Sequence, residues 1–356
     1  MSPRPTLVDL ARHLGVGKST VQRALSNDPR CNKETAARVR EAAEKLGYRP
    51  DPVFAAMVSR RQRKTGGGIP IAYLVNVVKA PERVGVLITE WLSARAEQLG
   101  YKVEVINLAT WDSPRRLWQI LYARGFAGVL LGTLRSDYRD LLLGNDRFPV
   151  VCVGRGDPLP FNTVRPAILP AVHQAWERMR ALGYRRIGAA IMRHEPMIED
   201  DFSRLAGALG CQALMGGDGG EAIPPLLDSL RGQSSFEEWV RRHRPDAVLG
   251  FHPGQYAVLR SMGIKIPRDM GFACLHNDFF NEGKRRPGMV ACMAQNFPLI
   301  ARSAVNLLDQ MIRHGERGVP AEPITITVES VWSDGRSLPS RLKKTRKPKP
   351  DPVGGV

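Results

Sequence analysis

Hydrophobic residues recur at helical spacing along the first 46 residues of the chain. The pattern predicts three helices, over residues 6–14, 18–25 and 33–46. Thr6 is a good N-cap for the first helix, and Gly15-Val16-Gly17 predicts a tight turn between the first two. Two short helices joined by a glycine turn, with a third helix supporting them, are typical of a helix-turn-helix unit.

From residue 69 onward, short apolar runs alternate with amphipathic segments. Strands are predicted at 69–78, 101–108, 127–132, 149–154, 185–191, 211–215, 246–251, 270–275 and 323–330. Helices are predicted at 82–99, 113–125 with Ser113 as N-cap, 167–182, 200–210, 234–243, 253–262 and 297–314, with a short helix before the strand at 149–154. Repeated strand–helix units predict an α/β fold: an N-terminal all-α headpiece followed by two doubly wound parallel-sheet lobes.

Composition divides the chain into four parts. The helix-turn-helix domain covers residues 1–50, and residues 51–68 form a hinge helix and a linker that ends in three glycines. The two-lobed domain covers residues 69–335. The segment 336–356 is rich in Lys, Arg, Pro and Gly, and is therefore predicted to be a disordered tail.

The net charge of +17 is concentrated at the two ends of the chain. Residues 1–64 contain 14 Lys and Arg against 6 Asp and Glu, and residues 336–356 contain 7 against 1. Residues 65–335 keep a surplus of only +3. A polyanionic partner is therefore expected at the ends, and a nearly neutral domain between them.

Several function classes find no support in the sequence. The five cysteines are scattered without CxxC spacing, which favours a reducing compartment and opposes a disulfide framework or a zinc site. No apolar stretch suits a membrane span or a signal peptide, so a cytoplasmic protein is expected. The Gly-rich segment 215–221 lacks the spacing of a phosphate loop, and no dinucleotide, nucleophile-elbow or metal motif is present. We therefore expect no enzyme activity, no cofactor and no metal.

The second helix carries the candidate DNA chemistry. Its predicted outer face presents Lys18, Ser19, Gln22 and Arg23, which are hydrogen-bond donors suited to the major groove. A small helical interaction module with a solvated basic face would show a similar pattern. The spacing alone leaves both interpretations open.

A short potential helix follows at residues 52–59. It is shorter than the ~12–15 residues that an isolated helix needs in water, so it requires a partner to stay folded. Its apolar stripe includes Val53 and Met57, and an apolar side chain held at a duplex can wedge into the minor groove. The alternative is a linker helix that packs on the following domain.

The N-terminal residues resemble a known family. The segments TLVDLARHLGVGKSTVQRAL at 6–25 and ETAARVREAAEKLGYRP at 34–50 look like the DNA-binding region of the lactose-repressor (LacI/GalR) family. The resemblance implies a homodimer whose two headpieces read a pseudo-palindromic operator in double-stranded DNA. It also implies a hinge helix that inserts an apolar residue into the minor groove, and a core at 69–335 that binds a small effector and dimerises.

The resemblance carries over to individual positions. Those matching the family's DNA contacts are Thr6, Lys18, Ser19, Thr20, Gln22, Arg23, Asn27 and Arg30, with Val53 and Met57 in the hinge. Met57 stands where the family usually has Leu, and Gln22 stands where it usually has Ser. Because Gln can pair with adenine through two hydrogen bonds, Gln22 is expected to alter the preferred operator.

His252, Asn277 and Asp278 follow predicted strands of the core, where ligands of doubly wound lobes bind, and Asn76 ends the first strand. These four residues and Arg204 are the candidate effector contacts. Arg204, in the family-like RLAG segment 204–207, is the first candidate, with a salt bridge to Asp200 or Asp201 as the alternative. A structural, hydrogen-bonded role is equally open for His252. The resemblance favours a carbohydrate or related metabolite as effector.

Three functions compete at this point. A ligand-responsive transcriptional regulator, by default a repressor, agrees with all the patterns above. A sugar-binding transport protein is opposed by the headpiece, and a sugar-metabolising enzyme with an appended headpiece lacks a catalytic constellation. A membrane partner is not expected.

Overall fold

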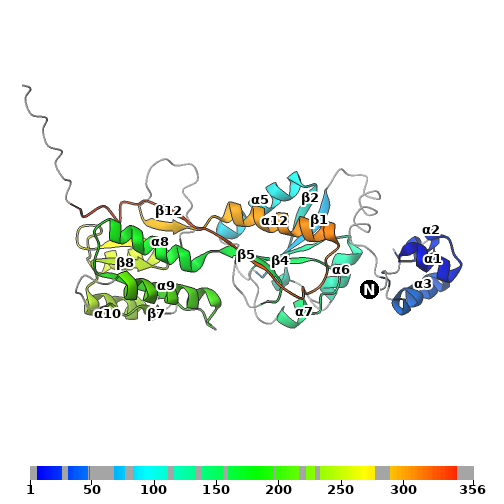
Figure 1. The fold of residues 1–356 in the computed structure, drawn as a ribbon, viewed down its shortest axis with the longest axis horizontal. Helices are drawn as coiled ribbons and strands as arrows, with labels where there is room; N and C mark the ends of the chain where they lie inside the picture. The colour runs from blue at the N-terminus through cyan, green and yellow to red at the C-terminus, as the bar shows by residue number, and fades with distance from the viewer. Residues whose placement is uncertain are drawn as a thin grey trace, which may run out of the picture. The chain divides into compact units, whose positions relative to one another are not determined.

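The computed structural model describes most of the chain as a helical headpiece and two α/β lobes (Figure 1). The described residues are 6–25, 31–46, 48, 68–76, 83–110, 116–132, 138–154, 159–195, 197–215, 222–228, 233–276 and 289–342. We call residues 68–154, 159–164 and 298–325 the first lobe, and residues 165–297 and 326–342 the second lobe. The chain passes between the lobes within the strands at 162–166 and 325–328, and again near residue 297, so the lobes are not two successive segments.

The headpiece consists of α1 (Leu7–Leu14), α2 (Lys18–Leu25) and α3 (Lys33–Lys45). Thr6 and Asp9 form a capping box, in which each side chain accepts a hydrogen bond from the other residue's amide. The Thr6 hydroxyl and amide both donate to the Asp9 carboxylate and keep its pKa below the usual value. Gly15 ends α1 with a φ of 64°, which glycine adopts without strain. The helices enclose a small core: Leu10, Ala11, Val21, Ala24, Ala36, Val39, Ala42 and Ala43.

The first lobe contains a six-stranded sheet in the order β11-β5-β4-β3-β1-β2. Its strands are β1 (Ile69–Val75), β2 (Tyr101–Asn107), β3 (Val129–Leu131), β4 (Val150–Val153), β5 (Asn162–Pro166) and β11 (Thr325–Val328). Strands β2, β1, β3, β4 and β5 pair in parallel. The helices are α5 (Arg83–Gln98), η1 (Leu108–Thr110), α6 (Leu117–Ala123), α7 (Arg139–Leu143) and α12 (Phe297–His314).

The second lobe contains another six-stranded sheet, in the order β12-β10-β9-β8-β6-β7. Its strands are β6 (Ile187–Met192), β7 (Leu226–Asp228), β8 (Ala247–Gly250), β9 (Gly271–Cys274), β10 (Ala291–Ala294) and β12 (Val331–Ser333). The helices are α8 (Ile168–Ala181), α9 (Glu199–Met215), α10 (Gln233–His243) and α11 (Gly254–Ser261). Strands β7, β6, β8, β9 and β10 pair in parallel, and β12 pairs with β10 in the antiparallel direction. The predicted fold class is therefore confirmed, with one antiparallel edge strand.

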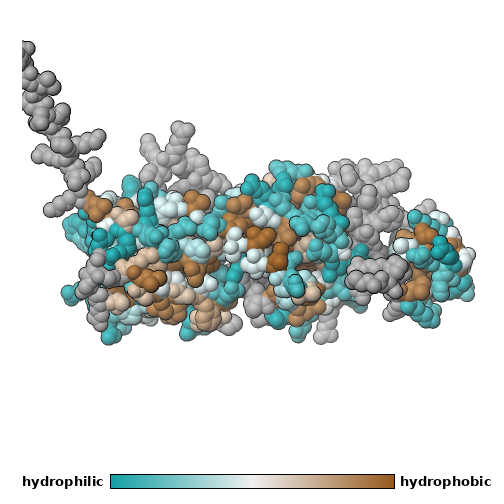
Figure 2. Space-filling model, viewed as in Figure 1, coloured by the Kyte–Doolittle hydropathy of each residue, from teal (hydrophilic) through white to brown (hydrophobic). Residues whose placement is uncertain are grey.

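The strand predicted at 211–215 is wrong, because these residues complete α9. The outward face of α9 is apolar: Phe202 is 58% exposed, Leu209 48% and Leu214 86%. Figure 2 shows hydrophobic side chains on the surface over this helix. An amphipathic helix is recognised in sequence by polar residues that recur on its outer face. Because the outer face of α9 carries apolar residues, residues 211–215 read as a short apolar run, and such a run predicts a strand.

Other differences concern short elements. No strand is predicted at β5, β7, β10 or β12, each of three to five residues. The helix predicted from Ser113 begins later, with Arg116 in the N-cap position, while residues 111–115 lie outside the described part. Segments this short contain too few positions to show a period.

The boundary predicted for the disordered tail is also wrong. Ser337 is 1% exposed and Leu338 4%, and Leu338 packs in the core of the second lobe. The Ser337 hydroxyl donates to the carbonyl of Phe272 at 2.6 Å and accepts from the amide of Ala291 at 2.9 Å. These contacts could not be predicted from the polar composition of the segment, because a single buried leucine shows no periodicity. Residues 343–356 lie outside the described part.

Candidate functional sites

The candidate DNA-reading surface is the outer face of α2. Lys18, Ser19 and Arg23 are exposed, and Thr20 is half-buried. The opposite face of the helix holds Val21, which is fully buried. The core of the headpiece thus fixes the orientation of α2, and Lys18, Ser19 and Arg23 lie on its exposed face.

Individual contacts on this surface are few and local. The Arg23 Nε donates to the carbonyl of Ser19 at 3.2 Å, so the guanidinium lies back along its own helix. The Thr6 Oγ1 accepts from the amide of Asp9 at 3.3 Å, which gives Thr6 a capping role beside its predicted role at DNA. The backbone of Gln22 belongs to α2. The predicted contacts at Asn27, Arg30, Val53 and Met57 lie outside the described residues.

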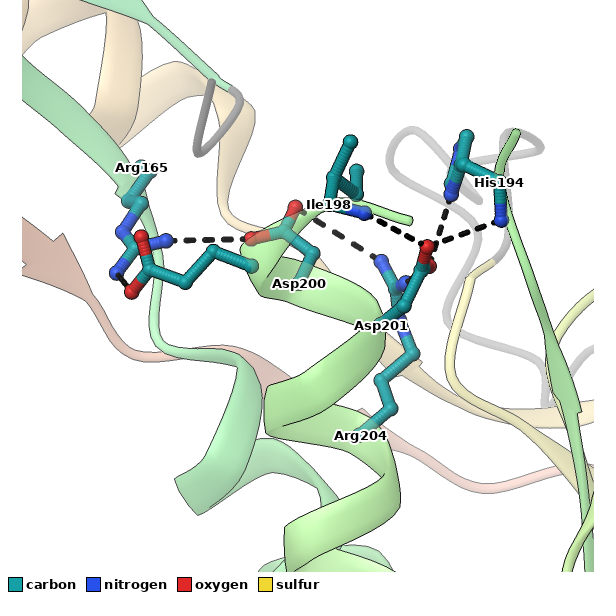
Figure 3. Close-up of polar contacts among 7 residues, drawn as sticks. Arg165, His194, Ile198, Asp200, Asp201 and Arg204 are labelled. Carbon is teal, nitrogen blue, oxygen red and sulfur yellow. Dashed lines mark hydrogen bonds and ion pairs between the residues drawn. The ribbon is translucent and has the colours of Figure 1, made fainter. Parts of the chain in front are cut away.

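The second lobe holds a buried polar cluster at the start of α9 (Figure 3). Asp201 is fully buried and Arg204 is 5% exposed, and their side chains meet at 3.0 Å between Oδ1 and Nη1. Asp201 also accepts from the backbone amides of His194 at 2.9 Å and Ile198 at 3.2 Å. Its Oδ1 lies 2.8 Å from Nδ1 of His194. Asp201 therefore joins the loop after β6 to the first turn of α9.

Burial and hydrogen bonding act in opposite directions on the Asp201 carboxyl. Burial raises its pKa, whereas the amides of His194 and Ile198 and the His194 ring lower it. The net result is a pKa below the ordinary aspartate value. The carboxylate is thus held ionised beside the Arg204 guanidinium.

A second arm of the cluster extends to β5. Arg165 pairs with Asp200 at 3.3 Å and also with Glu199. Asp200 lies 3.9 Å from Arg204, so two arginines and three carboxylates form one connected group. These contacts occupy the acidic start of α9, and among the described residues no group of three or more His, Cys, Asp or Glu is arranged to hold a metal ion.

Aromatic rings line the same end of the sheet. The Arg204 guanidinium lies 4.7 Å from the ring centre of Phe251, which follows β8. Phe251 stacks on His276, which follows β9, with ring centres 5.4 Å apart and an interplanar angle of 1°. His194, Phe251 and His276 therefore come from the carboxyl ends of three neighbouring parallel strands, where ligands of such sheets bind.

The structure places the predicted effector residues unequally. Arg204 makes the salt bridges that were its alternative, to Asp201 and at longer distance to Asp200, and it lies at the strand ends as well. His252 accepts from the amide of Gly254 at 3.0 Å through Nδ1, so it has a structural bond at the start of α11. Asn277 and Asp278 lie outside the described residues.

Asn76 belongs to the first lobe, directly after β1. Its Oδ1 is buried and accepts no hydrogen bond from the described residues, and the same holds for Oδ2 of Asp228 at the end of β7. A buried acceptor without a donor is costly, and it is commonly satisfied by a ligand or a water. Each of the two atoms, one in each lobe, therefore lacks a hydrogen-bond donor among the described residues at the carboxyl end of its sheet.

The sequence interpretation missed His194 and Arg165. His194 follows a predicted strand by three residues, which is the same signal that selected His252. Arg165 lies in β5, which was not predicted, so no sequence pattern linked it to residues 34 and 35 positions further along the chain.

Comparison with known proteins identifies the family. Residues 6–51 match the family described as bacterial regulatory proteins, lacI family, and residues 176–337 match the periplasmic binding protein-like domain. The chain is 41% identical over 254 residues to the HTH-type transcriptional regulator AglR of Rhizobium meliloti, covering 68% of each chain. The chain belongs to the LacI family. The resemblance noted in the sequence is therefore confirmed.

Solved LacI-family structures share the fold. One is described as a CelR–cellobiose complex, with a TM-score of 0.59, 23% identity and coverage of 94% of this chain and 100% of that one. Another is the lac repressor dimer bound to operator and the anti-inducer ONPF, with a TM-score of 0.59, 17% identity and coverage of 94% and 99%. As a LacI-family member, the chain is a DNA-binding transcriptional regulator. The helices of its described part include none long and apolar enough to cross a membrane.

Proposed function

We propose that this chain is a ligand-responsive repressor that binds a pseudo-palindromic operator as a homodimer. The observation that carries the proposal is the exposed row of Lys18, Ser19 and Arg23 on α2, opposite the buried Val21. This arrangement allows α2 to enter a major groove without disturbing the headpiece core. We assign the remaining DNA contacts to Thr6, Thr20, Gln22, Asn27 and Arg30, and the minor-groove contact to Val53 and Met57. The protein would act on chromosomal DNA in the cytoplasm.

The effector is a neutral carbohydrate or related polyol in this proposal. Arg204 and the ring of Phe251 offer a guanidinium fork and an apolar face at the strand ends. Asp228 in the second lobe offers a buried acceptor for a hydroxyl group, and Asn76 offers one within the first lobe. His252, Asn277 and Asp278 are assigned to the effector contacts of the second lobe. A related solved structure, the CelR complex, is described with cellobiose.

A genome-wide pull-down of DNA bound by the full-length protein tests the proposal. We expect a small number of sites that share one pseudo-palindrome, and reduced occupancy when a panel of mono- and disaccharides includes the effector. Binding without a shared sequence would contradict the repressor function. The genes beside the sites would narrow the choice of effector.

The substitution Gln22→Ser is expected to change the preferred operator sequence. A glutamine in the major groove pairs with adenine N6 and N7, and such a bidentate contact contributes about 1–3 kcal/mol of discrimination. Selection from a randomised duplex library should show altered preference at one symmetric pair of positions. Gln310→Ser, on the exposed side of α12, is the control. An unchanged selected sequence for Gln22→Ser would refute this role.

The substitution Arg204→Lys is expected to weaken the response to effector while leaving DNA binding without effector intact. Lysine keeps the charge beside Asp201 but loses the planar fork of donors. The effector concentration for half-maximal release should rise about tenfold or more, which corresponds to one lost charged hydrogen bond of roughly 1.5–3 kcal/mol. Arg260→Lys, on the exposed side of α11, is the control. An unchanged response would remove Arg204 from the effector site.

A further inference from the structure

The second lobe has a strongly basic surface at the amino ends of its strands, which we call the basic edge. Four segments build it: residues 180–186, 241–246, 265–269 and 336–342. The first three precede β6, β8 and β9, which are neighbours in the sheet. Together the four segments contain ten Lys and Arg residues and only two acidic residues, Asp246 and Asp269. Nine of the ten cations are arginines.

Hydrogen bonds and an ion pair join three of these segments into one surface, namely 180–186, 241–246 and 336–342. The Arg186 Nη2 donates to the carbonyl of His243 at 2.9 Å. Asp246 accepts from the backbone amides of Arg185 at 2.8 Å and Arg186 at 3.0 Å. The guanidinium of Arg341 lies 3.7 Å from Asp246 as well. The cations before β6 and β8 and in the C-terminal segment are therefore close neighbours.

The C-terminal segment runs along this edge of the sheet. Ser337 bonds the start of β9 and the start of β10, as described above. Further on, the Arg341 amide donates to the carbonyl of Leu182 at 2.8 Å, and its guanidinium lies 4.6 Å from the ring centre of Tyr184. The C-terminal segment 336–342 therefore belongs to the basic edge.

The two acids neutralise only part of this charge. Asp269 is occupied by the amide of Lys265 at 2.9 Å and by the Arg268 Nε at 2.8 Å. The hydrogen bond from Arg268 also lowers the pKa of Asp269. Within the described part of the chain, the exposed side chains of Arg242, Arg244 and Lys265 form no ion pair. Residues 65–335 have a net charge of only +3, yet the segments 180–186, 241–246 and 265–269 within them together carry a net charge of +6.

The chemistry of the basic edge favours a polyphosphate backbone. Arginine forks match phosphate oxygens, and duplex DNA presents roughly one phosphate per 1.7 Å of its axis. Three neighbouring strand ends span about 10 Å, so several phosphates fall within reach. Leu342 is the one large apolar side chain exposed among the described residues of the basic edge, which offers little for insertion into a membrane.

We propose that the basic edge forms a second DNA contact, which binds duplex phosphates without reading sequence. It acts independently of the headpieces and adds to the total affinity of the regulator for DNA. Operator choice stays with α2, because phosphate contacts carry no base information.

The test compares full-length proteins on an operator-free duplex over a range of salt concentrations. The edge variant carries Arg242→Gln, Arg244→Gln and Lys265→Gln, and the control variant carries Lys102→Gln, Arg116→Gln and Arg302→Gln in the first lobe, all exposed. Each lost phosphate contact should flatten the slope of log K against log salt by about 0.9. We expect a change of roughly 2–3 and at least about tenfold weaker binding near 0.1 M salt for the edge variant. The control variant should match the wild type.

Further arms separate DNA from other polyanions and from misfolding. A variant with Arg242→Lys and Arg244→Lys keeps the charge and should keep most of the salt slope. The edge variant should select the same operator sequence as the wild type and unfold at the same urea concentration. Equal slopes for the edge and control variants would overturn the proposal. Loss of binding only to phosphatidylserine vesicles or to polyglutamate, with duplex binding unchanged, would overturn it too.

Discussion

Val21→Ser is expected to abolish specific DNA binding while leaving both lobes folded. Val21 is fully buried on the inner face of α2, in a core that contains eight buried residues of the described headpiece. Removing its methyl groups and burying a hydroxyl costs about 2–4 kcal/mol. A domain of this size has little stability to spare, so the headpiece should unfold and operator affinity should fall about 100-fold or more.

The matched control is Val8→Ser, because Val8 in α1 of the same headpiece is 45% exposed. Operator titrations by fluorescence anisotropy should show a large loss for Val21→Ser and little change for Val8→Ser. Urea unfolding of the lobes should be the same in both variants. Specific binding by Val21→Ser at wild-type strength would contradict the orientation of α2 that the function requires.

Asp201→Asn is expected to destabilise the second lobe by about 3–5 kcal/mol. Asp201 is fully buried and accepts hydrogen bonds from two amides and from Arg204, so an asparagine NH₂ group would face donors. The Arg204 guanidinium, 5% exposed, would also lose its nearest carboxylate. A buried charge without its partner is costly because water cannot replace the lost interaction.

Urea unfolding at neutral pH measures this effect, with Glu195→Gln as control. The Glu195 side chain is 70% exposed and pairs with Arg193, and breaking such a pair should cost less than about 1 kcal/mol. If Asp201→Asn unfolded within about 1 kcal/mol of the wild type, the polar cluster would not hold the loop after β6 to α9.

The same substitution is expected to change the response to acid. The pKa of Asp201 in the folded chain lies below its value in the unfolded chain, which is about 3.9. Its contribution to stability is therefore fully present well above pH 4 and is lost as the pH falls through the lowered folded value. The wild type should lose more stability than Asp201→Asn between about pH 5 and pH 2.

The long elements of the lobes could be predicted because their local patterns agree with their packing. The predicted helix at 297–314 coincides with α12, and the predicted strand at 101–108 contains β2. The predicted strand at 211–215 fails because α9 exposes apolar residues, so its local pattern contradicts its surroundings. The prediction of disorder for 336–342 is wrong for the opposite reason: the segment is mostly polar, but it buries one serine and one leucine.

In the polar cluster, contacts within one helix could be predicted from the sequence, whereas contacts between distant elements could not. The sequence pointed to Arg204 and to its acidic neighbours, which are three and four residues away on the same helix. It did not point to Arg165, because a contact between β5 and α9 leaves no local period. The stacking of Phe251 on His276 likewise depends on β8 and β9 being neighbours in the sheet.

The sequence by itself determined the α/β class, the helical headpiece and the membership in the LacI family, because periodicity and dense local motifs encode these. It also located most of the charge, at the two ends of the chain. The tertiary structure decided that the C-terminal segment runs along the amino edge of the second sheet, and that arginines from segments up to about 160 residues apart form one basic edge. Strand order sets which strand ends are neighbours, and it depends on packing across the whole lobe.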